Sequence, residues 1–136
     1  NVINEFGQNP LHLVVMNVIA HQKDPRRKRQ MKFIEWLIDQ GVNIHLRDKG
    51  GYEALDFACM NNDMEVIEIL VDEGARFRRE NYSFRGTRKN LLNFISDPDV
   101  YKYVREKIMD EEEAFQAREE EKRIAKKAYV KWNPEE

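Results

Sequence analysis

The feature that most constrains the fold of this chain is an internal repeat. Residues 33–44, "FIEWLIDQGVNI", match residues 66–77, "VIEILVDEGARF", and their glycines Gly41 and Gly74 are 33 residues apart. The segments upstream also match, "NEFG" with "DKGG" and "PLH" with "ALD", but at a spacing of 44 residues. The difference predicts an insertion of about eleven residues between positions 20 and 30. Units of this kind bury their apolar residues by stacking on one another, which favours a repeat architecture.

Each unit has the pattern of a turn, a short helix, a loop and a second helix. Pro10 suits the first turn of a helix, where its missing N–H costs nothing. Gly41 and Gly74 suit a helix end, where the backbone becomes left-handed. Apolar residues recur at helical spacing in all four segments, which predicts an all-α fold: Leu11, Val14, Val15 and Val18; Phe33, Ile34, Trp36, Leu37 and Ile38; Leu55, Ala58 and Cys59; Val66, Ile67, Ile69, Leu70 and Val71.

These spaced residues resemble the ankyrin repeat family. The first unit keeps the family's glycine and its Pro-Leu-His at Gly7, Pro10, Leu11 and His12, with Asn4 for Asp and Asn9 for Thr. The second unit keeps Asp48, Gly51, Leu55, Ala58, Asn62, Glu65, Gly74 and Ala75, and departs from the family at Glu53, Ala54 and Asp56. The resemblance implies a solenoid of stacked helix-loop-helix units with short hairpin turns. It also implies that His12 is structural, and that the departures weaken the hydrogen bonding of the second hairpin.

The domain boundaries follow from the repeat. We expect an ankyrin-like stack over residues 1–108, with units at about 1–44 and 45–77 and a degenerate third unit, 78–108, that caps the stack. The chain opens at a junction between repeats, so we expect another repeat before Asn1. Residues 109–136 have charges at helical spacing and predict a charged helical arm.

The resemblance also implies a binding surface, formed by the hairpin tips and the inner helices. Its variable positions carry aromatic and methionine residues that buried structure does not require, and such residues on an exposed face are typical of a protein-binding patch. The predicted partner-binding residues are Phe6, Gln8, Met16, Asn17, Arg47, Lys49, Tyr52, Met60 and Asn61. The alternative is that neighbouring segments of the chain cover them.

Two readings of the arm remain open. Its apolar residues are too sparse for a long coiled coil, so it is a solvated charged helix, or its end at residues 129–132 inserts into a partner. Trp132 is the predicted contact in the second case, because Trp and Tyr are enriched at binding hot spots.

No catalytic, cofactor or metal site is predicted. His21 and His45 have no spaced ligand partners, and His12 has no nucleophile beside it. Cys59 fits a small core residue. We therefore expect a non-enzymatic protein that binds no cofactor and no small-molecule substrate.

Charge and cysteine usage bear on partners and compartment. The net charge is −2, so no global electrostatic field attracts the chain to nucleic acid or membrane. The single cysteine, Cys59, cannot form an internal disulfide, which favours a reducing compartment. Arg26, Arg27, Lys28 and Arg29 in the insertion form a basic cluster, which makes nucleic acid a weaker alternative partner. No apolar run reaches the roughly 18 residues of a membrane span, and we expect an intracellular protein, of the cytoplasm or the nucleus.

Two functions follow as hypotheses. The first is a protein-protein interaction module that uses the hairpin and inner-helix face, with the arm as a second contact. The alternative is a structural subunit of a large protein assembly, with or without RNA, held by the arm and the basic insertion.

Overall fold

The chain was analysed as a computed structural model that describes residues 3–77 and 91–132, with side chains through residue 130. The helices are α1 (Pro10–Met16), α2 (Pro25–Asp39), α3 (Ala54–Met60), α4 (Met64–Asp72) and α5 (Pro98–Trp132), with a 3-10 helix, η1 (Leu91–Phe94), before α5. No strand occurs among these residues. The all-α fold predicted from the sequence is therefore confirmed.

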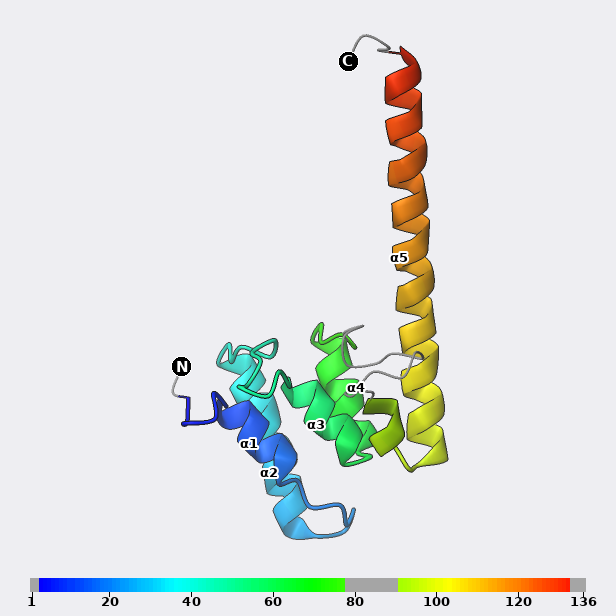
Figure 1. The fold of residues 1–136 in the computed structure, drawn as a ribbon. Helices are drawn as coiled ribbons and strands as arrows, with labels where there is room; N and C mark the ends of the chain where they lie inside the picture. The colour runs from blue at the N-terminus through cyan, green and yellow to red at the C-terminus, as the bar shows by residue number, and fades with distance from the viewer. Residues whose placement is uncertain (1–2, 78–90, 133–136) are drawn as a thin grey trace.

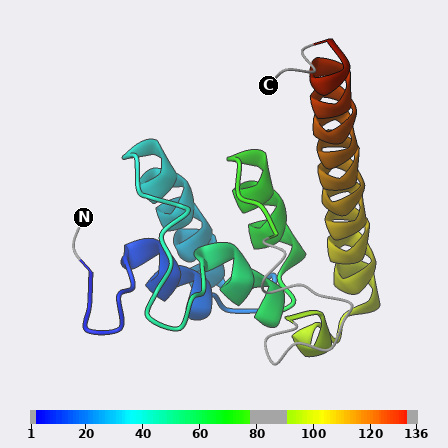
Figure 2. The same cartoon turned by 45° about the horizontal axis from the view of Figure 1, so that its top comes forward.

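The helices form two layers (Figure 1). α1 packs against α2 and α3, and α3 packs against α4 and η1. In the turned view α2, α4 and α5 stand side by side, while α1, α3 and η1 form a second row with the connecting hairpins below them (Figure 2). Each inner helix is thus paired with one outer helix, and η1 with α5 is the third pair. Residues 78–90 of the predicted degenerate cap lie outside the described residues.

The outer helices share a start signal that fixes the phase of the repeat. An aspartate precedes each of them, and its Oδ1 accepts a backbone amide of the first turn. Asp24 accepts from Arg26 N at 2.8 Å, Asp63 from Val66 N at 3.3 Å, and Asp97 from Asp99 N at 2.9 Å. The third aspartate identifies the beginning of α5 as the outer helix of the third pair.

The hairpin tips carry matching bonds in the two units. In the first, Gln8 N donates to Asn4 Oδ1 at 3.0 Å, and in the second Tyr52 N donates to Asp48 Oδ1 at 2.9 Å. Lys49 N then donates to the carbonyl of Phe6 at 2.9 Å, which ties one tip to the other. Gly7 has φ +77°, and a side chain added there would come within 3.2 Å of Lys49 N, so glycine is required at this crossing.

His12 joins the two units in the way that its structural role implies. Its backbone N donates to Asn9 Oδ1 at 3.1 Å, its Nδ1 accepts from Asn9 N at 3.2 Å, and its Nε2 lies 3.0 Å from the carbonyl of Tyr52. Because Nδ1 accepts, Nε2 carries the proton and donates. In the second unit Asp56 stands in the place of His12, and its Oδ2 accepts from Glu53 N at 2.9 Å. The departure from the family pattern therefore keeps this capping bond at the start of the helix, contrary to the weakening we expected.

The insertion is partly helical. α2 has 15 residues and α4 has 9, so the extra residues lengthen the outer helix and the turn that precedes it.

The first unit exposes part of its apolar helix. Phe33 is 43% and Trp36 54% exposed, and their rings stack with centroids 5.9 Å apart. The equivalent residues of the second unit, Val66 and Ile69, are buried and half-buried because the first unit lies beside them. The sequence pattern alone did not distinguish these two situations.

α5 runs through the predicted boundary between cap and arm without interruption. Val100, Val104 and Ile108 are buried at four-residue spacing, which is one face of a helix. Beyond Ile108 no described residue of α5 is fully buried. The boundary at residue 108 thus coincides with a change in burial inside one helix.

Candidate protein-interaction surface

The candidate surface is the face formed by α1, α3 and the two hairpin tips. Phe6 at the first tip is 58% exposed, and Met16 on α1 is 38% exposed. Met60 occupies the equivalent position on α3 and is half-buried. Leu13, one helical turn before Met16, is 41% exposed. These four side chains give the face an apolar character.

Leu13 was missed by the sequence analysis. It was read as neither core nor surface, although its spacing of three residues from Met16 places both on one side of the helix. Its equivalent on α3 is Phe57, whose ring lies 5.9 Å from His12 and 5.8 Å from Tyr52. The position therefore packs partly on the core and partly faces outward.

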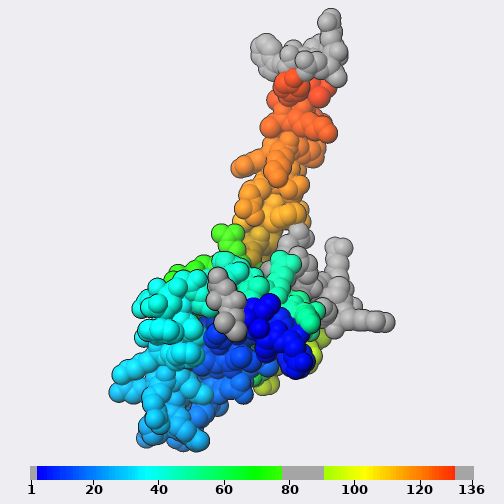
Figure 3. Space-filling view, turned by 90° about the vertical axis from the view of Figure 1, so that its left-hand side faces the viewer, coloured from blue at the N-terminus to red at the C-terminus, as the bar shows by residue number. Residues whose placement is uncertain are grey.

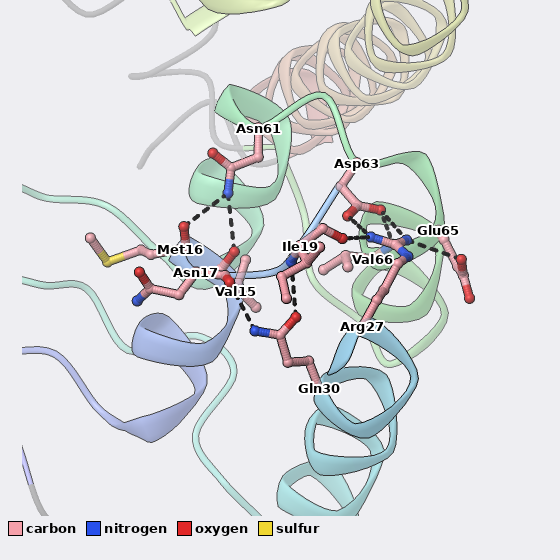
Figure 4. A network of polar contacts seen from close by, with 10 residues as sticks. All are labelled: Val15, Met16, Asn17, Ile19, Arg27, Gln30, Asn61, Asp63, Glu65 and Val66. Carbon is pink, nitrogen blue, oxygen red and sulfur yellow. Dashed lines mark hydrogen bonds and ion pairs between the residues drawn. The ribbon is translucent and has the colours of Figure 1, made fainter. Parts of the chain in front are cut away.

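Two asparagines hold the inner helices in place. Asn61 Nδ2 donates to the carbonyls of Val15 at 3.1 Å and of Met16 at 3.4 Å (Figure 4). Asn17 Nδ2 donates to the carbonyl of Leu13 at 2.7 Å. Both residues remain exposed. Their amide groups already satisfy helix-end carbonyls, so these predicted contact residues also position Met16.

Gln8 differs from its prediction as a partner-binding residue. Its side chain is only 9% exposed. Its Nε2 donates to Asp48 Oδ2 at 3.2 Å, and its Oε1 accepts from Asn4 Nδ2 at 3.1 Å. The side chain therefore links the two hairpins, and it is not presented to a partner.

The second hairpin tip adds positive charge. Arg47 and Lys49 are exposed there, and Tyr52 is half-buried with its ring against Phe57. The tip therefore combines a half-buried aromatic ring, Tyr52, with two exposed cationic side chains, Arg47 and Lys49. Such a mixture suits a polar rim around an apolar centre.

Arg27 is the clearest departure from the predicted basic cluster. It is 3% exposed, and its Nη1 donates to Asp63 Oδ2 at 2.7 Å and to the carbonyl of Ile19 at 2.8 Å. Its Nη2 donates to Asp63 Oδ1 at 3.0 Å and to Glu65 Oε2 at 3.1 Å (Figure 4). Hydrogen bonds to Asp63 are the main reason why the pKa of Arg27 is raised. Since the guanidinium is enclosed by these partners, Arg27 cannot contact a nucleic acid, and that prediction was wrong.

The other basic residues of the insertion lie on the surface. Arg26 pairs with Asp24 at 2.8 Å, and hydrogen bonds from the Arg26 side chain and backbone lower the pKa of Asp24 to about 2. Lys28 and Arg29 are exposed. Three of the four predicted cations therefore lie on the surface, and Arg26 is the one of the three that is paired with Asp24.

The arm is a single helix as far as Trp132. Ile124, Tyr129 and Val130 on it are 55–56% exposed. The side chain of Trp132, the predicted contact, lies outside the described residues.

A second apolar surface lies at the end of the stack formed by α1 and α2, which faces the viewer in Figure 3. A groove of about 350 Å³ there is lined in part by Ile3, Pro10, Trp36, Val42 and Leu46. The sequence analysis placed Trp36 among the apolar residues of this helix and did not find the groove.

The described part of the chain has neither a candidate metal site nor a candidate membrane-spanning helix. No group of three histidine, cysteine, aspartate or glutamate side chains there could hold a metal ion. No helix in the same ranges is both long and apolar enough to cross a lipid bilayer.

Paired helices in two layers, tied unit to unit by hairpin tips, define a helical repeat protein. Comparison with known families identifies the repeat: residues 24–71 match the family model of ankyrin repeats (many copies). The matched residues include α2, the second hairpin and most of α4, and the match agrees with the resemblance that the sequence pattern carries.

Curated relatives agree with this assignment. A protein of Fowlpox virus (strain NVSL) that is named as an ankyrin repeat protein is 27% identical over 101 residues, or 74% of this chain and 20% of its own length. A protein of Acanthamoeba polyphaga mimivirus, also named as an ankyrin repeat protein, is 31% identical over 67 residues. That match covers 49% of this chain and 57% of the relative. The chain thus spans a fifth of the first relative and about half of the second. No solved structure matches the chain.

Ankyrin repeats are in general protein-binding modules and not enzymes. The fold therefore gives a class of function for this chain, whereas the partner depends on the residues of its surface.

Proposed function

We propose that this chain is a non-catalytic protein-interaction module that binds its partner through the face of α1, α3 and the hairpin tips. The observation that carries the proposal is the exposure of apolar side chains on this face, led by Phe6 at 58% and followed by Leu13 and Met16. Full burial of an exposed apolar side chain contributes roughly 1.5–3 kcal/mol, and these side chains, which are about half-exposed, would contribute about half of that each.

The backbone beneath this face is rigidly held, which favours recognition with little ordering cost. His12 bonds the second unit through Tyr52, and Asn61 bonds the first unit through Val15 and Met16. Arg47 and Lys49 at the second tip provide charged contacts at the rim of the apolar centre. The proposed contact residues are Phe6, Leu13, Met16, Asn17, Arg47, Lys49, Tyr52, Met60 and Asn61.

The arm is the proposed second contact. From Gln116 to Val130 every residue of α5 is exposed, so this length of helix is available to a partner.

The test is affinity purification from native cells to obtain the partner, followed by binding measurements with purified variants. We expect the double change Phe6→Ala and Met16→Ala to weaken binding at least tenfold, since truncated hot-spot side chains cost about 2 kcal/mol or more. Trp36→Ala is the matched control, because Trp36 is equally apolar and 54% exposed but lies on the outer helix α2. Tyr52 is left unchanged because its ring packs on Phe57.

An unchanged affinity of the double variant, with an intact helical spectrum, would refute the contact face. A loss of affinity in Trp36→Ala alone would move the contact to the end of the stack.

A structural subunit of a larger assembly remains the second candidate. The exposed length of α5 and the exposed Lys28 and Arg29 favour it, because both features extend beyond the repeat stack. Purification separates the two functions: a chain that is soluble and stable alone favours the module, and insolubility without neighbouring proteins favours the subunit.

A further inference from the structure

The outer part of α5, from residue 116 onward, lies beyond the buried and half-buried residues of this helix. It projects away from the stack in both views (Figures 1 and 3). Residues 116–130 are exposed throughout, and Ile124 is 56% exposed. Most of the stability of a helix in a protein comes from tertiary packing of one of its faces, and not from helix propensity. A partner for this segment, residues 110–130, would therefore stabilise it.

The charges of this segment are divided between its two halves. Residues 110–120 hold six acidic residues and one basic residue, whereas residues 121–130 hold four basic residues and one acidic residue. Two pairs within the helix join the halves where they meet, Glu119 with Lys122 at 3.5 Å and Glu120 with Arg123 Nε at 3.0 Å. The outer blocks, residues 110–113 and 126–127, are about 20 Å apart along the axis and cannot pair within one helix.

We propose that this segment pairs with the same segment of a second copy of the chain, in the antiparallel direction. Antiparallel pairing places the acidic half of each copy beside the basic half of the other, whereas parallel pairing places like charges together. Opposite charges across an interface favour one orientation and register of the two helices, and like charges that face each other disfavour the alternatives.

A stripe of small and apolar residues gives the register. Ala114, Ala117, Ile124 and Ala128 lie on one side of the helix at the alternating three- and four-residue spacing of a coiled-coil seam. When the pair is centred on Glu119, Ala114 faces the second copy's Ile124, and each alanine lets the two backbones approach closely.

Asp110 and Glu121 lie on the same side of the helix as this stripe, and their charges favour the antiparallel register. In the antiparallel register, Asp110 lies beside the second copy's Lys127, and Glu121 lies beside the second copy's Arg118. A parallel pair in register would set Asp110 against Asp110 and Glu121 against Glu121. The stripe therefore favours one orientation as strongly as the charge blocks do.

This inference rests on the arm contact of the proposed function and names its occupant. It does not depend on the contact face of α1 and α3. A chain that fails to pair through its arm can still bind a partner through Phe6 and Met16, so the two ideas fail separately.

The experiment is sedimentation equilibrium of the full chain at concentrations up to the millimolar range, at low and high salt. Two variants reverse one block each: Asp110→Lys with Glu113→Lys, and Lys126→Glu with Lys127→Glu. Both leave the two pairs within the helix unchanged. We expect the unchanged chain to approach twice its monomer mass, each variant alone to stay at monomer mass, and an equal mixture of the two variants to approach twice the monomer mass again. Added salt is expected to weaken association in each case.

Several results would overturn the proposal. One is a monomer mass for the unchanged chain at every concentration. Another is a mixture that stays monomeric although circular dichroism shows both variants to be helical. A third is a doubled mass for each variant alone, which would place the contact elsewhere, such as the end of the stack at Trp36.

Discussion

Replacing Arg27 tests how strongly the two repeats are coupled. Arg27 lies on α2, and its partners Asp63 and Glu65 lie at the start of α4. Arg27→Met keeps the unbranched apolar part of the side chain but removes the charge and all four hydrogen bonds. The side chain of Asp63 would then remain only 11% exposed, without its cation.

The magnitude follows from this burial. Removing one partner of a buried ion pair costs about 3–5 kcal/mol, because the remaining charge is left uncompensated. We expect a value near the lower end, about 3 kcal/mol, because Glu65 is 53% exposed and water already screens it. For a chain of this length the loss corresponds to a melting temperature lower by about 10 °C.

The assay is urea unfolding followed by circular dichroism. Since stability in stacked repeats is a sum of unit and interface contributions, weakening this interface should lower the midpoint and also broaden the transition. Arg26→Met is the matched control: the same change one residue earlier, where the arginine is 69% exposed and pairs only with the cap Asp24. Its midpoint should stay unchanged within error.

A double-mutant cycle isolates the pair. Asp63→Asn removes the charge but keeps an oxygen for the cap, because Asn caps a helix about as well as Asp. The two changes together should cost less than the sum of the single costs, by about 1–3 kcal/mol. Additive costs, or an Arg27→Met midpoint equal to that of the Arg26→Met control, would show that the ion pair does not couple the units.

Three further changes test other parts of the structure. His12→Ala should destabilise the chain by at least about 2 kcal/mol in the same urea assay, because hydrogen bonds to buried backbone groups are lost. The control, His21→Ala, changes an exposed histidine and should not lower the midpoint. Equal midpoints for the two variants would contradict the role of His12 between the units. Arg26→Met should raise the pKa of Asp24 from about 2 toward its ordinary 3.8, because the side-chain hydrogen bonds are lost while the backbone N–H of residue 26 stays. The stability that goes with the lowered pKa is present above 3.8 and lost as the pH falls toward 2, and water screening of the exposed arginine keeps it too small to move the urea midpoint at neutral pH. An NMR titration of the carboxyl carbon measures the pKa, and an unmoved pKa would exclude the Arg26 side chain as the cause. Deletion after Met109 should leave one cooperative unfolding transition, since Ile108 is the last buried residue of α5 among the side chains that the structure describes. Loss of cooperativity would move the domain boundary into the arm.

The sequence determined the local structure because its signals act within a few residues. Pro10 and the glycines after α2 and α4 mark helix starts and ends through backbone geometry alone. The repeat spacing gave the pairing of helices, since equivalent units must bury equivalent faces. The exposure of Phe6, Met16, Arg47 and Lys49 at the hairpin tips and on α1 was an implication of the resemblance to the ankyrin repeat family.

Only the tertiary structure decided where charges and aromatic rings lie. Arg27 and Asp63 are 36 residues apart in sequence, and no local pattern predicts that their side chains meet. Arg27, which the sequence placed in a basic surface cluster, is therefore buried in an ion pair between the two units. Phe33 and Trp36 have the same spacing as Val66 and Ile69, but burial depends on which neighbour stands beside the helix. Gln8 is likewise enclosed because a second hairpin crosses it. Helical periodicity fixes which side of a helix a residue occupies, and the stacking of whole units decides what that side faces.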